Sequence, residues 1–240
     1  MQVVLLRVGI DTGSGGIHGP LFSDGSFEYI PIPDRFGGNG VDKRTYGNTR
    51  EKGERRLVDY FPEARRESIS GQSLHFDPEF ETFTYGDPTP PKASLRRLDE
   101  GSLLVFYAGL KGWDCNCPPG LYIIGFFDVA RAGLATSFSQ AEIAGMFQNN
   151  FHVMHGDVFK NQKDRLVLVK GNADSRLLKK AVKISSVGAD KNGRPLHRLS
   201  PEMQAVFGGF AGHTSIQRSP PRWVAPEFTQ CAAQFILALR

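Results

Sequence analysis

Two long apolar segments rich in aromatic residues, 102–110 and 121–130, constrain the fold of this chain more than any other feature. They read Ser-Leu-Leu-Val-Phe-Tyr-Ala-Gly-Leu and Leu-Tyr-Ile-Ile-Gly-Phe-Phe-Asp-Val-Ala. β-branched and aromatic residues favour strands, and the ten residues between the segments contain the glycine and proline that are typical of a loop. The two segments are therefore predicted to form an antiparallel strand pair.

Shorter segments predict the rest of the secondary structure. The segment 139–149 indicates a helix that begins with a capping box formed by Ser139 and Glu142, and Ser200 with Pro201 indicates a second helix start. Strands outnumber helices, and turns rather than crossover helices connect them. We therefore expect one α+β domain over 1–240, with a mixed, largely antiparallel sheet or small barrel and peripheral helices. Segments 2–11 and 27–33 are expected to form a hairpin or neighbouring strands, and two further strands are expected at 80–85 and 166–170. The remaining expected helices are 175–184 and 226–239.

A polar, arginine-rich stretch over 36–66 shows no sustained apolar period and is expected to cross the surface, ordered by a partner. The chain has no apolar run long enough to span a membrane, and its N-terminus is too short and too early charged for a signal peptide. A cytoplasmic location is expected. The three cysteines, with a single residue between Cys115 and Cys117, predict reduced thiols.

Positive charge is concentrated in two parts of a chain whose formal net charge is only +4. The segment 160–198 contains eleven basic and three acidic residues, and 35–66 contains nine basic and five acidic residues. Local excesses of this kind suit a nucleic acid, because neutralised phosphates release counterions. Ordinary solvated basic faces are the alternative explanation.

The first expected strand runs into a glycine-rich turn, 9–20, which resembles a phosphate-binding loop but matches neither familiar motif. A P-loop ends in Gly-Lys-Ser/Thr, whereas this turn continues as Gly15-Gly16-Ile17. The dinucleotide-binding fingerprint requires glycine where His18 stands and a helix where Pro20 follows. ATP and NAD are therefore disfavoured, and no cofactor is predicted.

The same turn offers backbone N–H groups that approach a ligand closely, with Asp11, Thr12, Ser14 and His18 projecting from it. A carboxylate such as Asp11 beside a bound phosphate suits cleavage of an N-glycosidic bond, whose transition state resembles an oxocarbenium ion. His18 would protonate the departing base or bind phosphate. An aspartate that merely caps a long, tight turn explains the pattern equally well.

Aromatic residues of the strand pair and its loop, above all Tyr107 and Trp113, are candidates for stacking on an extruded base, although such residues more often belong to the core. The histidines at 152 and 155 lack a convincing helical period, and the cysteine pair lacks a zinc spacing, so no metal is predicted. The polar segment 212–223 is either a loop that contacts a nucleic-acid backbone or a plain connector.

Several stretches together resemble the third nucleotide-modification-associated domain family. They are Leu5–Leu21, Phe27–Asp34, Gly86–Pro88, Leu104–Leu110, Gly120–Gly125, Leu168–Gly171 and Ser175–Leu178. This family is linked to the modification, recognition or restriction of altered DNA bases. The strand–loop–strand unit is also similar to PUA-like barrels that hold modified bases, and the chain resembles anti-phage glycosylases that excise glucosylated hydroxymethylcytosine.

The resemblance implies a hydrolase that flips a bulky modified base out of phage DNA and leaves an abasic site. The alternatives are a non-catalytic reader of modified bases and an enzyme that alters a base. Asp11 and His18 are the predicted catalytic residues. The predicted DNA-binding residues are Arg7, Thr12, Gly13, Ser14, Gly15, Gly16, Tyr107, Trp113, Lys170, Ser175, Arg176, His213 and Arg218.

Overall fold

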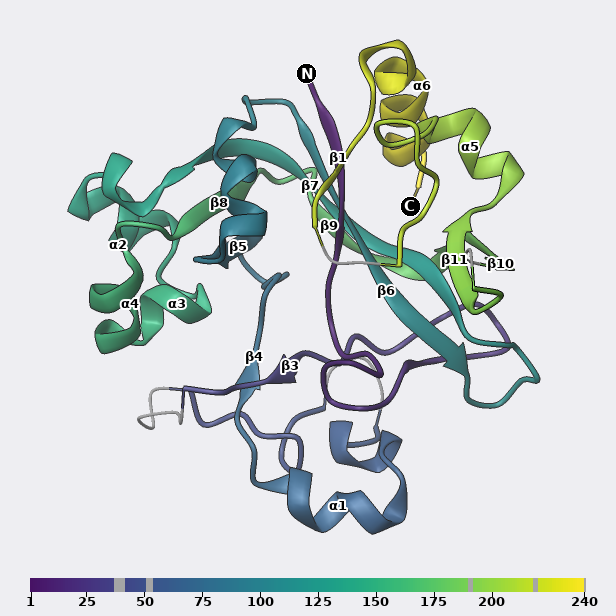
Figure 1. Cartoon of the computed structure of the whole chain (residues 1–240). Coiled ribbons are helices and arrows are strands. Elements are labelled where there is room, and N and C mark those ends of the chain that lie inside the picture. Colours follow the sequence, from purple (N-terminus) through teal and green to yellow (C-terminus); the bar gives the residue numbers. More distant parts are fainter. Residues whose placement is uncertain (37–41, 51–53, 190–191, 218–219, 240) are drawn as a thin grey trace.

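The computed structural model describes residues 1–36, 42–50, 54–189, 192–217 and 220–239 (Figure 1). Its centre is an eight-stranded sheet whose main path has the order β12-β1-β6-β7-β8-β5, with β2 added beside β6 and β9 beside β7. The strands of this sheet are β1 (Val3–Arg7), β2 (Gly19–Leu21), β5 (Thr84–Asp87), β6 (Leu103–Gly112), β7 (Gly120–Leu134), β8 (Val167–Gly171), β9 (Arg176–Lys183) and β12 (Arg222–Trp223).

The predicted strand pair is confirmed as β6 and β7, which are antiparallel from Leu103 opposite Asp128 to Leu110 opposite Gly120. β1 and β2 both run parallel to β6, and the other ladders of the sheet are antiparallel. The largely antiparallel α+β class is thus correct. The barrel is not formed in the described part of the chain, because β12 and β5 end the sheet and share no ladder.

Two small ladders and several short helices surround the sheet (Figure 1). The ladders are β3 (Ile32–Pro33) with β4 (Leu74–His75), and β10 (Ser185–Ala189) with β11 (Pro195–Leu199). The helices are α1 (Glu63–Ser70), α2 (Gln140–Met146), α3 (Phe151–Met154), α4 (Gly156–Gln162), α5 (Pro201–Phe207) and α6 (Pro226–Leu237). The 3-10 turns are η1 (Leu57–Tyr60), η2 (Pro90–Arg97) and η3 (Ala135–Ser137).

The helix ends follow the sequence signals. Ser139 caps α2, with Glu142 completing the capping box, and Ser200 caps α5, whose first residue is Pro201. The segment 175–184 was predicted as a helix, and this is wrong: it forms β9, which pairs with β7 and buries Leu178. Ladder hydrogen bonds and burial outweigh the weak helix propensity of this basic segment.

Other expectations also change. β1 pairs with β6 and β12 rather than with 27–33, which contacts the turn after β1 through a hydrogen bond from Ile10 N to Ile30 O of 2.9 Å. The described part of 36–66 is not a surface excursion. Tyr46 and Leu57 are fully buried, and the Tyr46 hydroxyl donates to Pro31 O at 2.7 Å. The expected strand at 80–85 begins later, as β5.

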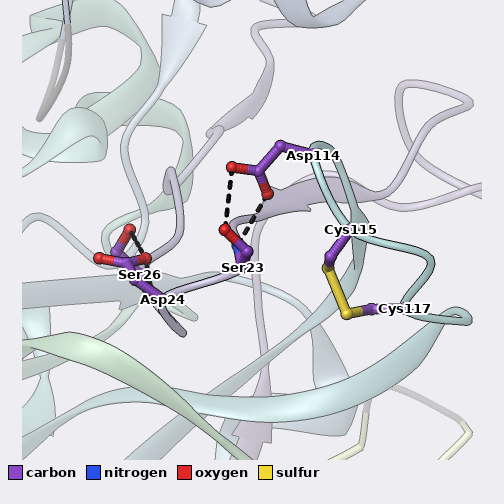
Figure 2. The surroundings of a disulfide bond; sticks show 6 residues. All are labelled: Ser23, Asp24, Ser26, Asp114, Cys115 and Cys117. Carbon is purple, nitrogen blue, oxygen red and sulfur yellow. Dashed lines mark hydrogen bonds between the residues drawn. A yellow bond between two sulfur atoms is a disulfide. The ribbon is translucent and has the colours of Figure 1, made fainter.

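The prediction of reduced thiols is wrong for two of the three cysteines. Cys115 and Cys117 form a disulfide in the loop between β6 and β7, where their Cα atoms lie 5.4 Å apart, a separation that a disulfide spans (Figure 2). Asp114 in the same loop accepts a hydrogen bond of 2.7 Å from Ser23 N. This hydrogen bond joins the loop to the turn that follows β2. The third cysteine, Cys231, is a free thiol, as predicted.

Aromatic side chains fill the core behind β6 and β7. Phe106 and Phe127 are fully buried with ring centroids 4.7 Å apart, and Phe80 packs edge-on against both at 5.6 Å. This cluster fixes the chain between β4 and β5 against the sheet. Among the described residues, no helix is long and apolar enough to cross a membrane.

Candidate functional site

The glycine-rich turn is the dark purple loop at the foot of β1 in Figure 1. Asp11 organises it: its Oδ1 accepts hydrogen bonds of 2.7 Å from the backbone N–H groups of Gly13 and of Ser14. The carbonyl of Asp11 also accepts from Gly16 N at 2.8 Å. Asp11 therefore caps the turn, as one of the two sequence interpretations expected, and its carboxylate is held in one orientation.

Gly15 shows why this turn needs glycine. Its φ is +91°, and a Cβ atom there would lie 2.3 Å from Ile10 Cγ1 in the core. We expect Gly15→Ala to lower the free energy of unfolding by about 2–4 kcal/mol, because a left-handed conformation and a core clash add together. Gly101→Ala is the matched control, since Gly101 has a φ of +74° and no atom within 4 Å of the added carbon. Urea denaturation should show a smaller loss of unfolding free energy for Gly101→Ala. Equal losses in the two variants would show that the contact with Ile10 does not contribute.

Arg7, the last residue of β1, lies beside this carboxylate. Its Nη2 is 3.1 Å from Asp11 Oδ2, its Nη1 donates to Gln217 O, and both charged side chains are mostly buried. The buried Arg7 Nε has no hydrogen-bond partner among the described residues. The Arg7–Asp11 pair thus combines a fixed carboxylate with a guanidinium whose Nε–H makes no hydrogen bond among the described residues.

A cleft of about 810 Å³ opens next to the pair. Arg7, Asp11, Gly13 and Ser14 line one wall of it. This volume is within the range of about 300–1,000 Å³ that is usual for ligand pockets. These four predicted residues, from the strand end and the turn, therefore share one cavity.

Two histidines and an aspartate that the sequence interpretation did not group together also line this cleft. Asp77 Oδ2 lies 3.0 Å from the Nε2 atoms of His75 and of His152. His155, the residue that spacing paired with His152, instead bonds through Nδ1 to Phe151 O at 2.8 Å. The sequence signal for this group was the His-Phe-Asp run at 75–77, but the third member, His152, lies 75 residues after Asp77.

Further polar groups hold this His/Asp/His cluster, defined as His75, Asp77 and His152. The second Asp77 oxygen, Oδ1, accepts from Gly86 N at 2.9 Å and from Asn150 Nδ2 at 3.3 Å. Burial alone would raise the pKa of Asp77, but the hydrogen bonds from the two histidines outweigh it and the pKa is lowered. Burial alone would lower the pKa of His152, but its hydrogen bond to Asp77 and the charge of Asp77 raise it. Opposite charges thus stabilise each other inside the protein.

The second half of the glycine turn faces a different cavity, of about 530 Å³. Thr12, Gly16 and His18 line it together with Lys111 and Trp113. Arg66 and Tyr60 also line it, and the ring of Trp113, a residue that is 41% exposed, has its centroid 5.1 Å from that of the Tyr60 ring. The turn therefore separates a cleft that contains Asp11 from a cationic, aromatic cavity that contains His18.

The two predicted catalytic residues nevertheless both pack against Gly109 in β6. A Cβ atom at Gly109 would be 3.1 Å from His18 Cδ2 and 3.9 Å from Asp11 Cβ. Glycine at this position leaves room for both side chains. Burial, followed by the charge of Arg7, lowers the pKa of His18 below its ordinary value of 6.5, and the opposing charge of Asp11 does not cancel this.

This lowered pKa predicts how stability depends on pH. The unfolded chain binds a proton at His18 more readily than the folded chain, so the free energy of unfolding should fall as pH drops from 6.5 through the lower folded-state pKa. His18→Gln should remove that part of the acid destabilisation and change little above pH 7. Urea denaturation of both proteins across this range measures it, and parallel pH profiles would contradict the expectation.

The other predicted residues do not join this site. Tyr107 is fully buried and its hydroxyl donates to Ile216 O at 3.0 Å, so its position belongs to the core and does not fit stacking on a base. Lys170 donates to Thr82 O, and Ser175 Oγ accepts from Asp128 N at 3.1 Å. The guanidinium of Arg176 lies over the Phe126 ring, and His213 is exposed. Arg218 lies outside the described residues.

A comparison with protein families gives the same assignment as the sequence motifs. The family model described as nucleotide modification associated domain 3 matches residues 2–236, almost the whole chain. No curated protein and no solved structure is significantly similar to it. The match includes the turn, both cavities and the His/Asp/His cluster, and it supports a role with modified nucleotides. The chain belongs to the nucleotide modification associated domain 3 family.

Proposed function

We propose that this protein is a DNA glycosylase that removes a bulky modified base, of the glucosylated hydroxymethylcytosine type, and leaves an abasic site. One observation carries the proposal. The Asp11 carboxylate is fixed at the wall of the 810 Å³ cleft by two backbone N–H groups and by Arg7. A carboxylate that need not reorganise is suited to stabilise positive charge that develops on a deoxyribose ring.

In this reaction the bond between C1′ and the base nitrogen breaks, and the base leaves with the bonding electrons and takes up a proton. Water adds to C1′ and gives up a proton, which balances the step. Asp11 faces the oxocarbenium-like sugar, and Arg7 beside it supplies a cation for the adjoining phosphate. We assign the proton donor for the departing base to His18, because its ring and the Asp11 side chain both pack against Gly109.

The neighbouring cavity is suited to an extruded base or a flanking nucleotide. Lys111 and Arg66 supply positive charge there, and the exposed Trp113 ring offers a stacking surface. The basic segment 160–198, which includes β8, β9, β10 and most of β11, would contact the duplex outside the cavities.

Trp113→Ala should weaken binding to DNA that carries the modified base by about 5- to 150-fold, because base–aromatic stacking contributes about 1–3 kcal/mol. Fluorescence anisotropy with a labelled duplex measures this. Leu237→Ala is the control, since Leu237 is also an exposed apolar side chain but lies at the end of α6, outside both cavities and outside the basic segment. Equal affinities for the two variants would exclude Trp113 from the binding surface.

The test of the whole proposal uses the wild-type chain with phage DNA that carries glucosylated hydroxymethylcytosine and with the same DNA unmodified. We expect mass spectrometry to detect free modified base, and an abasic-site nuclease to cut only the treated, modified DNA. Tight binding without base release would overturn the glycosylase and support a reader of modified bases. A changed base that stays attached to the sugar would support a base-modifying enzyme.

A further inference from the structure

We propose that the His/Asp/His cluster is a binding site for a divalent transition-metal ion, with coordination positions open to the cleft. The three residues offer two imidazole nitrogens and one carboxylate oxygen, all within 4.8 Å of one another. This donor set, with positions left open, is typical of mononuclear iron and zinc centres in proteins. The inference does not rest on glycosidic cleavage.

The geometry of the donor atoms suits an ion. Asp77 Oδ2 is 3.0 Å from each histidine Nε2. Ligand atoms that lie about 2.1 Å from a metal and about 90° apart are about 3.0 Å from each other. The two Asp77–histidine distances therefore match those between ligands of one ion, and the two histidine nitrogens lie within 4.8 Å of each other. All three residues line the cleft, so a bound ion has an approach from solvent.

The partners behind the ligands are those that metal-binding residues require. Gln162 Oε1 lies 2.7 Å from His152 Nδ1, and because an amide oxygen only accepts, Nδ1 carries the proton. The Nε2 lone pair of a neutral His152 then faces the cluster, in the orientation that a metal ligand needs.

Asp77 and the second histidine are oriented in a similar way. Asp77 Oδ1 accepts from Gly86 N and Asn150 Nδ2, which leaves Oδ2 turned toward both imidazoles. His75 stacks on Phe151 with ring centroids 3.8 Å apart. A Cβ atom at Gly86 would lie 2.8 Å from Asn150 Oδ1 and 3.1 Å from His152 Cδ2, so this packing depends on glycine in β5.

Isothermal titration calorimetry of the chelator-treated full chain with Zn²⁺, and visible absorption with Co²⁺, test the site. We expect an equimolar amount of Zn²⁺ to bind and Co²⁺ to give ligand-field bands. His75→Ala and His152→Ala should weaken binding more than Gln162→Met, which should weaken it by about 10- to 100-fold because it removes only the orienting acceptor. His155→Ala is the control, because this histidine is also buried but bonds to Phe151 O and is not one of the three donors.

Circular dichroism of each variant separates a lost ligand from a lost fold, and Gln162→Met keeps all three donors in place. The proposal is overturned if the folded wild-type chain binds neither ion. It is also overturned if folded His75→Ala and His152→Ala bind as tightly as His155→Ala. Because these readouts measure binding alone, they are independent of base release, and either proposal can fail without the other.

Discussion

Replacing Asp11 by asparagine should slow base release by about 100- to 1,000-fold, the usual effect of removing one fixed electrostatic group from a transition state. Asparagine keeps the shape of the side chain, and its oxygen can still accept from the N–H groups of Gly13 and Ser14 that hold the turn. The change removes the negative charge facing the sugar, and with it the ion pair between Asp11 Oδ2 and Arg7 Nη2. Single-turnover measurement of free modified base checks the rate, and binding to DNA should be unchanged or tighter, since the phosphates meet less repulsion.

The matched control for this variant is Asp24→Asn. Asp24 is also an aspartate that caps a short turn, with Oδ1 accepting from Ser26 N at 2.8 Å, but it lies near the disulfide loop and outside both cavities (Figure 2). We expect wild-type rates for it. Equal rates for Asp11→Asn and Asp24→Asn would remove Asp11 from the mechanism, even if the wild-type chain excises bases.

The elements that the sequence predicted well are those whose signals are local. Apolar segments rich in aromatic and β-branched residues predicted β6 and β7, and a serine followed by glutamate three residues later predicted the start of α2. The short basic segment of β9 was misassigned because its charges fit an exposed helix face, while its strand state depends on pairing with β7. Pairing between distant segments also decides that the sheet stays open in the described part of the chain.

The same distinction holds at the site. Arg7, Asp11 and His18 lie within one strand and one turn, so their proximity could be read from the sequence. His75 and His152 come from β4 and α3, and they meet only because the chain between β4 and β5 folds against α3. Tyr107 shows the opposite error: strand alternation cannot tell a core face from a pocket face when both faces are buried.

Phe127→Ala should cause the largest loss of stability among the changes considered, about 3–5 kcal/mol, which corresponds to a melting temperature lower by about 10 °C. Phe127 is fully buried, and its ring contacts Phe106, Phe80 and Phe83 with centroids 4.7, 5.6 and 5.9 Å away. Truncation to alanine removes a ring from the middle of this cluster and leaves a cavity that packed neighbours cannot close. Differential scanning calorimetry and urea denaturation measure the loss.

Phe127→Leu separates lost volume from lost ring geometry. Leucine refills most of the space, so it should recover more than half of the lost stability if the cavity dominates, whereas equal losses would assign the effect to the edge-on ring contacts.

Phe127→Ala should also disturb the cleft, because Phe80, which packs on Phe127, lies three residues after Asp77. Folded Phe127→Ala should then bind Zn²⁺ more weakly than Phe127→Leu, although neither variant alters a ligand. Unchanged affinity in both would show that Gly86 and Asn150 hold Asp77 without support from the core.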